Sequence, residues 1–149
     1  MTNSLARQAF ALRARFPEAK TKLTPTRFTW IAALQPSELS RIYTVRVTLA
    51  DCRFPKVEVL DPALEGRPGE SIPHLFSNGS LCLHLDHEWS GDMMMVDTTV
   101  PWTCEWLLNY EIWRATGVWY GGGEWPPRRV DFEATTVGPA STSAATAEN

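Results

Sequence analysis

The chain has 149 residues, a length that fits one domain with its own hydrophobic core. Hydrophobic residues make up 44% of the sequence and charged residues 21%, which is ordinary for a globular domain. The formal net charge of -3 argues against nucleic-acid binding, which normally needs a basic surface. No apolar run approaches the ~20 residues of a membrane-spanning helix, and arginines interrupt the first sixteen residues, so we expect no signal peptide.

The cysteine content indicates a reducing environment. Cys52, Cys82 and Cys104 are odd in number and lack the spacing of a disulfide framework. We therefore expect free thiols and a cytoplasmic protein.

The N-terminal segment predicts an amphipathic helix over residues 4–16. Ser4 is a suitable N-cap, and Pro17 ends the helix. The apolar side chains expected on its buried face are Leu5, Ala9, Leu12 and Phe16.

An antiparallel meander is predicted next. Residues 27–34 and 43–49 alternate between apolar and polar side chains, which is typical of strands with one face in water. Val57 and Val59 continue the alternation in a third strand, which Asp61-Pro62 closes.

The second half of the sequence predicts a long loop and then a second helix. Residues 61–80 contain Pro, Gly, Ser and Asn without periodicity, and long loops in compact domains are often functional. Residues 100–116 predict a helix with Thr99 as its cap, Pro101 in its first turn and Gly117 as its end. Its apolar stripe consists of Trp102, Trp106, Tyr110 and Trp113.

The composition changes towards the C-terminus. Residues 133–149 contain no aromatic residue, no Lys and no Arg, so we expect a disordered tail there. Residues 1–132 are then the folded domain. The order of helix, meander, long loop and helix is α+β.

The most informative stretch is residues 72–83, Ile-Pro-His-Leu-Phe-Ser-Asn-Gly-Ser-Leu-Cys-Leu. It resembles ubiquitin-conjugating enzymes, which carry a His-Pro-Asn tripeptide, a turn ending in Asn-Gly or a similar pair, and then a Cys-Leu dipeptide. The segment Phe-Pro-Lys-Val at 54–57 matches the family's entry into the third strand. The resemblance covers about residues 1–116 and implies a ubiquitin-conjugating-enzyme-like fold with a catalytic cysteine at Cys82.

A closer likeness is to the stand-alone conjugating-enzyme-like proteins of bacterial type II CBASS anti-phage operons. The segments that carry it are 78–83, 100–102, 105–108, 110–113, 116–119 and 121–123. Nothing in the sequence corresponds to the two further C-terminal helices of the eukaryotic enzymes, so one main C-terminal helix is expected.

The chemistry of Cys82 fits this resemblance. A thiolate attacks acyl carbonyls well, and the resulting thioester stays reactive towards amines. The tetrahedral intermediate needs a hydrogen-bond donor aimed at its oxyanion. His74 stands in the slot of the family's asparagine, eight residues before Cys82, and is our candidate donor, with a loop-stabilising role as the alternative. The turn amides near Asn78 and Gly79 are further candidate donors.

A metal site is the competing interpretation of the same stretch. Cys82, His84, His87 and the upstream His74 are all possible zinc ligands. Cys82 and His84 would also share one face if this stretch were a strand. The spacing C-x-H-x-x-H is not a strong zinc pattern, so we expect no metal and no cofactor, and we expect Cys52 and Cys104 to be bystanders.

The sequence contains no nucleotide-binding glycine motif, so this chain cannot activate a carboxylate with ATP. Either a separate enzyme loads Cys82, or Cys82 attacks a peptide bond near a partner's C-terminus. The resemblance implies the second route, with the C-terminal tail of the operon's cGAS-like nucleotidyltransferase as the partner and cyclic-nucleotide synthesis as the regulated output. Two alternatives stay open: a non-catalytic tail-binding scaffold, and a conjugating enzyme for a bacterial ubiquitin-like protein. Any isopeptide on this chain's own side chains has to use Lys20, Lys22 or Lys56.

Overall fold

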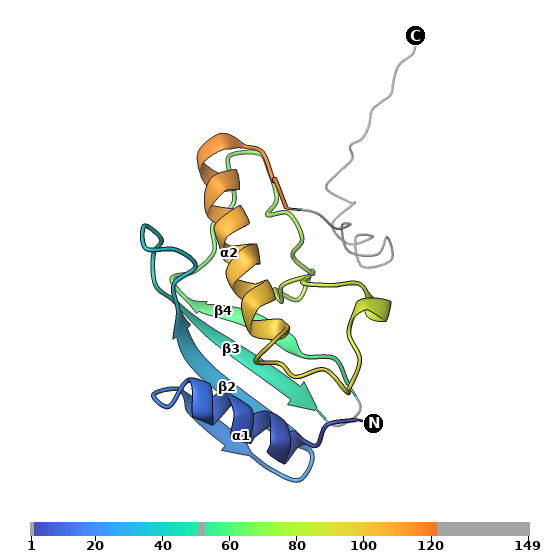
Figure 1. Cartoon of the computed structure of the whole chain (residues 1–149). Coiled ribbons are helices and arrows are strands. Elements are labelled where there is room, and N and C mark those ends of the chain that lie inside the picture. Colours follow the sequence, from blue (N-terminus) through green and yellow to red (C-terminus); the bar gives the residue numbers. More distant parts are fainter. Residues whose placement is uncertain (1, 51–52, 122–149) are drawn as a thin grey trace.

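The computed structural model describes residues 2–50 and 53–121 (Figure 1). Its elements, in chain order, are α1 (Leu5–Arg15), β1 (Lys20–Leu23), β2 (Arg27–Leu34), β3 (Tyr43–Ala50), β4 (Lys56–Asp61), the short 3-10 helix η1 (Asp86–Glu88) and α2 (Thr99–Thr116). The predicted α+β class and the order of helix, meander, loop and helix are therefore confirmed. Cys52 and the tail expected over residues 133–149 lie outside the described residues.

The sheet has four antiparallel strands in the order β1-β2-β3-β4, one more than the sequence predicted. The additional strand is β1, whose Lys22 pairs with Thr29 of β2. Three of the four residues of β1 are exposed, so its side chains show no alternation of apolar and polar character. The strand exists because its backbone pairs with β2, and its side chains carry little sign of that pairing.

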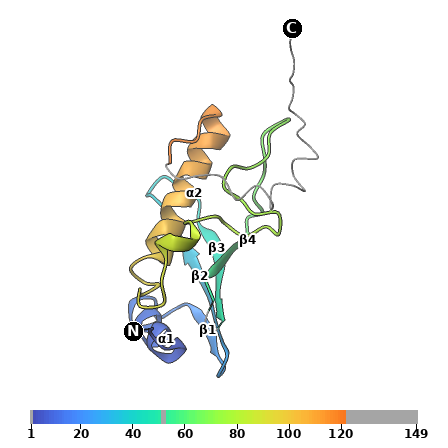
Figure 2. The same cartoon turned by 90° about the vertical axis from the view of Figure 1, so that its right-hand side faces the viewer.

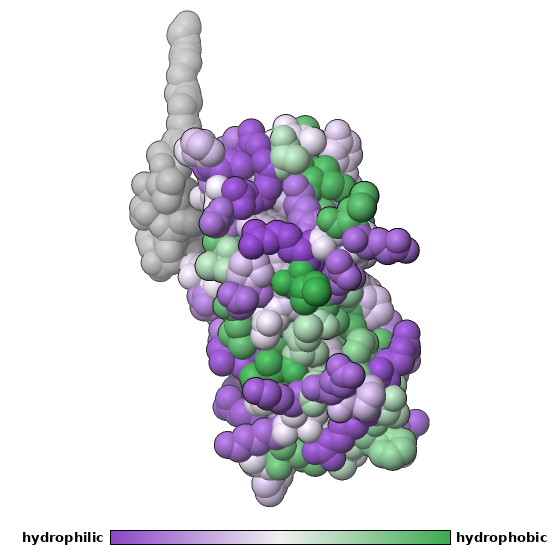
Figure 3. All heavy atoms as spheres, turned by 90° about the vertical axis from the view of Figure 1, so that its left-hand side faces the viewer, coloured by the Kyte–Doolittle hydropathy of each residue, from purple (hydrophilic) through white to green (hydrophobic). Residues whose placement is uncertain are grey.

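Both helices lie on the same face of the sheet, which gives the molecule two layers (Figures 1 and 2). The alternating residues of β2 and β3 point towards the helices and are buried, as their pattern predicted. The largest fully buried side chains of this core are Trp30, Tyr43, Phe28, Leu12, Met95 and Leu107. Apolar side chains are scattered among polar ones on the face that Figure 3 shows.

The helix ends follow from local hydrogen bonds. The Ser4 side chain accepts a hydrogen bond from the Arg7 amide at 3.1 Å, which confirms it as the cap of α1. The N-cap of α2 is Thr98, not Thr99 as expected, and Thr99 is the first helical residue and is buried. Gly117 ends α2 in the left-handed conformation, with φ of 83°, as expected. No helix within the described residues is long and apolar enough to cross a membrane.

Candidate active site

Cys82 and His74 lie opposite each other across a tight loop. The Cys82 amide donates a hydrogen bond to the His74 carbonyl oxygen at 2.9 Å. Leu75 and Leu81 form an isolated antiparallel bridge one step further into the loop. The structure therefore brings together the two residues that the sequence singled out, although they are eight positions apart in the chain.

The tip of this loop is stabilised by its own hydrogen bonds. The Asn78 side-chain oxygen accepts from the Ser80 amide at 2.9 Å and from the Ser80 hydroxyl at 2.7 Å. Gly79 has a φ of 89°, which favours glycine, and its amide donates to the Phe76 carbonyl at 2.9 Å. The Gly79 amide is therefore engaged within the loop. This corrects the expectation that it serves as an additional oxyanion donor.

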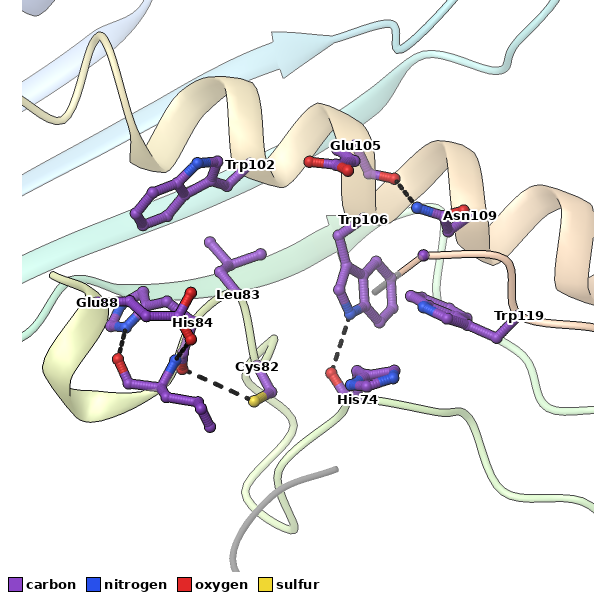
Figure 4. A pocket seen from close by; sticks show the side chains of 12 residues that line it. His74, Cys82, Leu83, His84, Glu88, Trp102, Glu105, Trp106, Asn109 and Trp119 are labelled. Atoms are coloured by element: carbon purple, nitrogen blue, oxygen red, sulfur yellow. Dashed lines mark hydrogen bonds between the residues drawn. The ribbon is translucent and has the colours of Figure 1, made fainter. Parts of the chain in front are cut away.

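A groove of about 250 Å³ runs between the loop and α2 (Figure 4). The loop side contributes His74, Cys82, Leu83, His84, Leu85 and Glu88, α2 contributes Trp102, Glu105, Trp106 and Asn109, and the segment after α2 contributes Trp119 and Gly121. The helix side of the groove consists of two aromatic and two polar side chains.

His74 is buried and sits in an unusual backbone conformation. Its φ is 53°, in the left-handed region that a non-glycine residue adopts only when its surroundings impose it. The Trp106 indole N–H donates to the His74 carbonyl oxygen at 2.9 Å, so that oxygen accepts from both Cys82 and α2. The His74 ring packs on Trp119, with the ring centroids 5.1 Å apart. In Figure 4 the ring is directed towards Trp119, and the Cys82 sulfur lies on the other side of the His74 backbone.

Cys82 combines a buried position with a place in the groove lining. Its sulfur lies 4.0 Å from the His84 carbonyl oxygen. The other described thiol, Cys104, is half-buried on α2 and does not line the groove. Burial raises the pKa of the Cys104 thiol, which disfavours its reactive thiolate form. Of these two thiols, only Cys82 is placed to meet a peptide in the groove.

The residues of the alternative zinc site are arranged differently from the sequence expectation. Residues 82–85 do not form a strand, so the expected common strand face of Cys82 and His84 does not exist. His84 lines the groove, whereas His87 is exposed in η1 and is not part of the lining. Among residues 2–50 and 53–121, no group of three or more His, Cys, Asp or Glu side chains is arranged to hold a metal ion.

Two further residues of the site were not identified from the sequence. Trp106 was assigned to the core stripe of α2, and it is buried there, but its indole N–H also reaches the loop. Trp119 follows α2, where no periodicity applies. The Thr-Gly-x-Trp segment, which carries part of the family resemblance, drew attention to Trp119 but did not reveal what Trp119 contacts.

The fold and the site together define a class of protein. Within residues 2–50 and 53–121, a helix, an antiparallel meander, a long loop that carries a groove-lining cysteine and a following helix fit a ubiquitin-conjugating-like domain. The family model for the type II CBASS E2 protein matches residues 8–127, and the chain belongs to this family. No curated protein matches the chain.

Proposed function

We propose that this protein is a conjugating enzyme that carries an acyl group on Cys82 as a thioester. We further propose that its acyl donor is the C-terminal tail of the cGAS-like nucleotidyltransferase in its CBASS operon. The observation that carries the proposal is the position of Cys82 in the lining of an open groove, in a chain of the type II CBASS E2 family. The other described thiol is half-buried and lies outside the groove.

The groove supports transfer of a peptide tail. An extended chain that lies along Trp102 and Trp106 of α2 brings one carbonyl over the Cys82 sulfur. The thiolate attacks that carbonyl carbon and forms the S–C bond, and the tetrahedral intermediate collapses with cleavage of the C–N bond. The departing nitrogen takes up a proton from water as it leaves with the residues beyond the cleaved bond.

His74 is our proposed oxyanion donor. It lines the groove, and a backbone hydrogen bond of 2.9 Å holds its main chain beside that of Cys82. A donor of this kind contributes about 10²- to 10³-fold to the rate in enzymes where it has been removed. A neutral amine then attacks the thioester carbonyl and forms a C–N bond while the S–C bond breaks. The amine loses a proton to water, and Cys82 returns as the thiolate. On the partner, the result is a modified C-terminus through which nucleotide synthesis is regulated.

The experiment mixes the purified protein with the nucleotidyltransferase of its operon and compares reducing with non-reducing gels. We expect a thiol-sensitive adduct that Cys82→Ala abolishes and that Cys104→Ala, the matched control, leaves in place. Cys82→Ser should slow capture and give a longer-lived oxyester, because a hydroxyl ionises far less readily than a thiol. A parallel reaction with ATP and an activating enzyme shows whether Cys82 attacks a peptide bond directly or needs an activated tail.

Two outcomes would contradict the thioester proposal. One is an adduct that survives Cys82→Ala. The other is no adduct under either condition while the tail still binds, which would favour a non-catalytic tail-binding scaffold.

A further inference from the structure

We propose that Trp119 is a positioning residue that holds His74 in the orientation needed for acyl transfer at Cys82. This inference rests on the proposed function, because it assigns Trp119 a role in the same chemistry. It concerns a residue outside the loop and outside α2, in the segment that follows the helix.

His74 is held at two points by two tryptophans. Trp106 donates its indole N–H to the His74 carbonyl oxygen at 2.9 Å. Trp119 packs against the His74 ring at a centroid distance of 5.1 Å and an interplanar angle of 38°. Trp119 in turn packs edge-on against Trp106, with centroids 5.4 Å apart. Figure 4 shows the three rings gathered at one end of the groove.

These contacts stabilise a backbone conformation of His74 that is unfavourable on its own. A non-glycine residue in the left-handed region costs about 1–3 kcal/mol and persists only where the surrounding structure fixes it. The carbonyl hydrogen bonds hold the backbone of His74. The Trp119 ring, tilted by 38° to the His74 ring, limits the rotation of the His74 side chain and so helps to position its ring nitrogens relative to the groove.

The conformation of the chain after α2 places Trp119 in the groove. Gly117 has a φ of 83°, which turns the chain back towards the groove. At Gly121, an added Cβ atom would lie 2.7 Å from the Asn109 side-chain nitrogen and 2.8 Å from the Trp119 indole nitrogen, so only glycine fits there without movement. Tyr120, between Trp119 and Gly121 in the chain, is 70% exposed and does not line the groove. Trp119 lines the groove and is partly buried.

The test measures two reactions of Cys82 that need no partner protein. Acylation by p-nitrophenyl acetate passes through a tetrahedral intermediate and needs an oxyanion donor, and it releases p-nitrophenolate as the S–C bond forms and the ester C–O bond breaks. Alkylation by iodoacetamide is a direct displacement without an oxyanion, so it reports only the accessibility and ionisation of the thiol. Rates are corrected with Cys82→Ala, and mass spectrometry locates the modification.

His74→Ala removes the donor itself and should slow acylation about 10²-fold. Trp119→Ala leaves the donor in place but less well positioned, and should slow acylation about 10-fold. Alkylation should change less than about 2-fold in both variants. Trp119→Phe, which keeps an aromatic face, should recover most of the acylation rate, and Tyr120→Ala should react like the wild type. In a double-mutant cycle, Trp119→Ala should add little to His74→Ala, because the two residues act through one interaction.

Several results would overturn the inference. These are an unchanged acylation rate in Trp119→Ala or in His74→Ala, an equal loss of acylation and alkylation, or a full Trp119→Ala effect in the absence of the His74 side chain. Because the ester replaces the partner's tail, these results are independent of the partner-capture experiment. A failure to capture the nucleotidyltransferase would contradict the proposed function and leave the measured coupling of Trp119 to His74 standing.

Discussion

Glu111 offers the sharpest stability prediction, because its carboxylate joins α2 to the connection between β2 and β3. It accepts hydrogen bonds from the Ser40 hydroxyl at 2.7 Å, the Arg41 amide at 3.2 Å and the Tyr43 hydroxyl at 2.8 Å. Both carboxylate oxygens are used, one by Ser40 and the other by Arg41 and Tyr43. A neutral amide of the same shape therefore cannot satisfy all three donors.

Glu111→Gln replaces one of these oxygens by an NH₂ group, which then faces a donor. A hydrogen bond to a charged group contributes about 1.5–3 kcal/mol. We therefore expect the free energy of unfolding to fall by about 2–3 kcal/mol, with the Tm lower by roughly 10 °C.

Glu65→Gln is the matched control for this substitution. Glu65 also bonds to a residue of α2, through Arg114 at 2.8 Å, but its side chain is 65% exposed. Exposed ion pairs contribute about 0–1 kcal/mol. Urea unfolding and thermal melting of both variants provide the comparison. A loss below about 0.5 kcal/mol for Glu111→Gln, or equal losses for the two variants, would refute this reasoning.

Three further predictions concern other parts of the fold. Gly117→Ala should lower the free energy of unfolding by about 1–2 kcal/mol in urea titrations, because alanine is strained at a φ of 83°, and an unchanged stability would contradict this. Burial is the main cause that raises the pKa of Tyr43 well above its usual value, and the hydrogen bond to Glu111 is the next. The protonated phenol therefore contributes its full stability below pH ~10, and this contribution falls at higher pH. Wild-type protein should therefore lose more stability than Tyr43→Phe between pH 8 and pH 11, and parallel losses would show that another group titrates. A chain that ends at residue 132 should keep the Tm of the full chain, since residues 133–149 have almost nothing to bury, and a Tm many degrees lower would show that they pack.

The sequence predicted those elements whose side chains divide cleanly between core and solvent. β2 and β3 alternate along their full length, and α1 and α2 carry apolar stripes, so their positions followed from periodicity. β1 was missed because backbone pairing creates it while most of its side chains stay exposed. The start of α2 was misplaced by one residue because two adjacent threonines offer the same residue-type signal, while the Thr98 hydroxyl makes no capping bond and donates to the Met94 carbonyl instead.

The site was predicted in part. The resemblance of the Asn-Gly-Ser-Leu-Cys-Leu stretch to a known family predicts Cys82 and His74 as site residues, and the structure places both in the lining of one groove. Their mutual position depends on main-chain hydrogen bonds within the loop, which residue types do not encode. The role that we propose for Trp119 depends on where the chain passes after Gly117, and neither spacing nor composition determines that path.

One helix, α2, supplies both the packing of the core and the wall of the groove. Trp106 belongs to both, since it is 4% exposed and also donates to His74. Any large change at Trp106 therefore alters stability and chemistry together, and its kinetic effect cannot be separated from unfolding. Trp119 reaches the same histidine from a segment that carries little of the core. The double-mutant cycle of Trp119 and His74 therefore isolates the contribution of ring orientation to the reactivity of Cys82. A substitution at Trp106 does not.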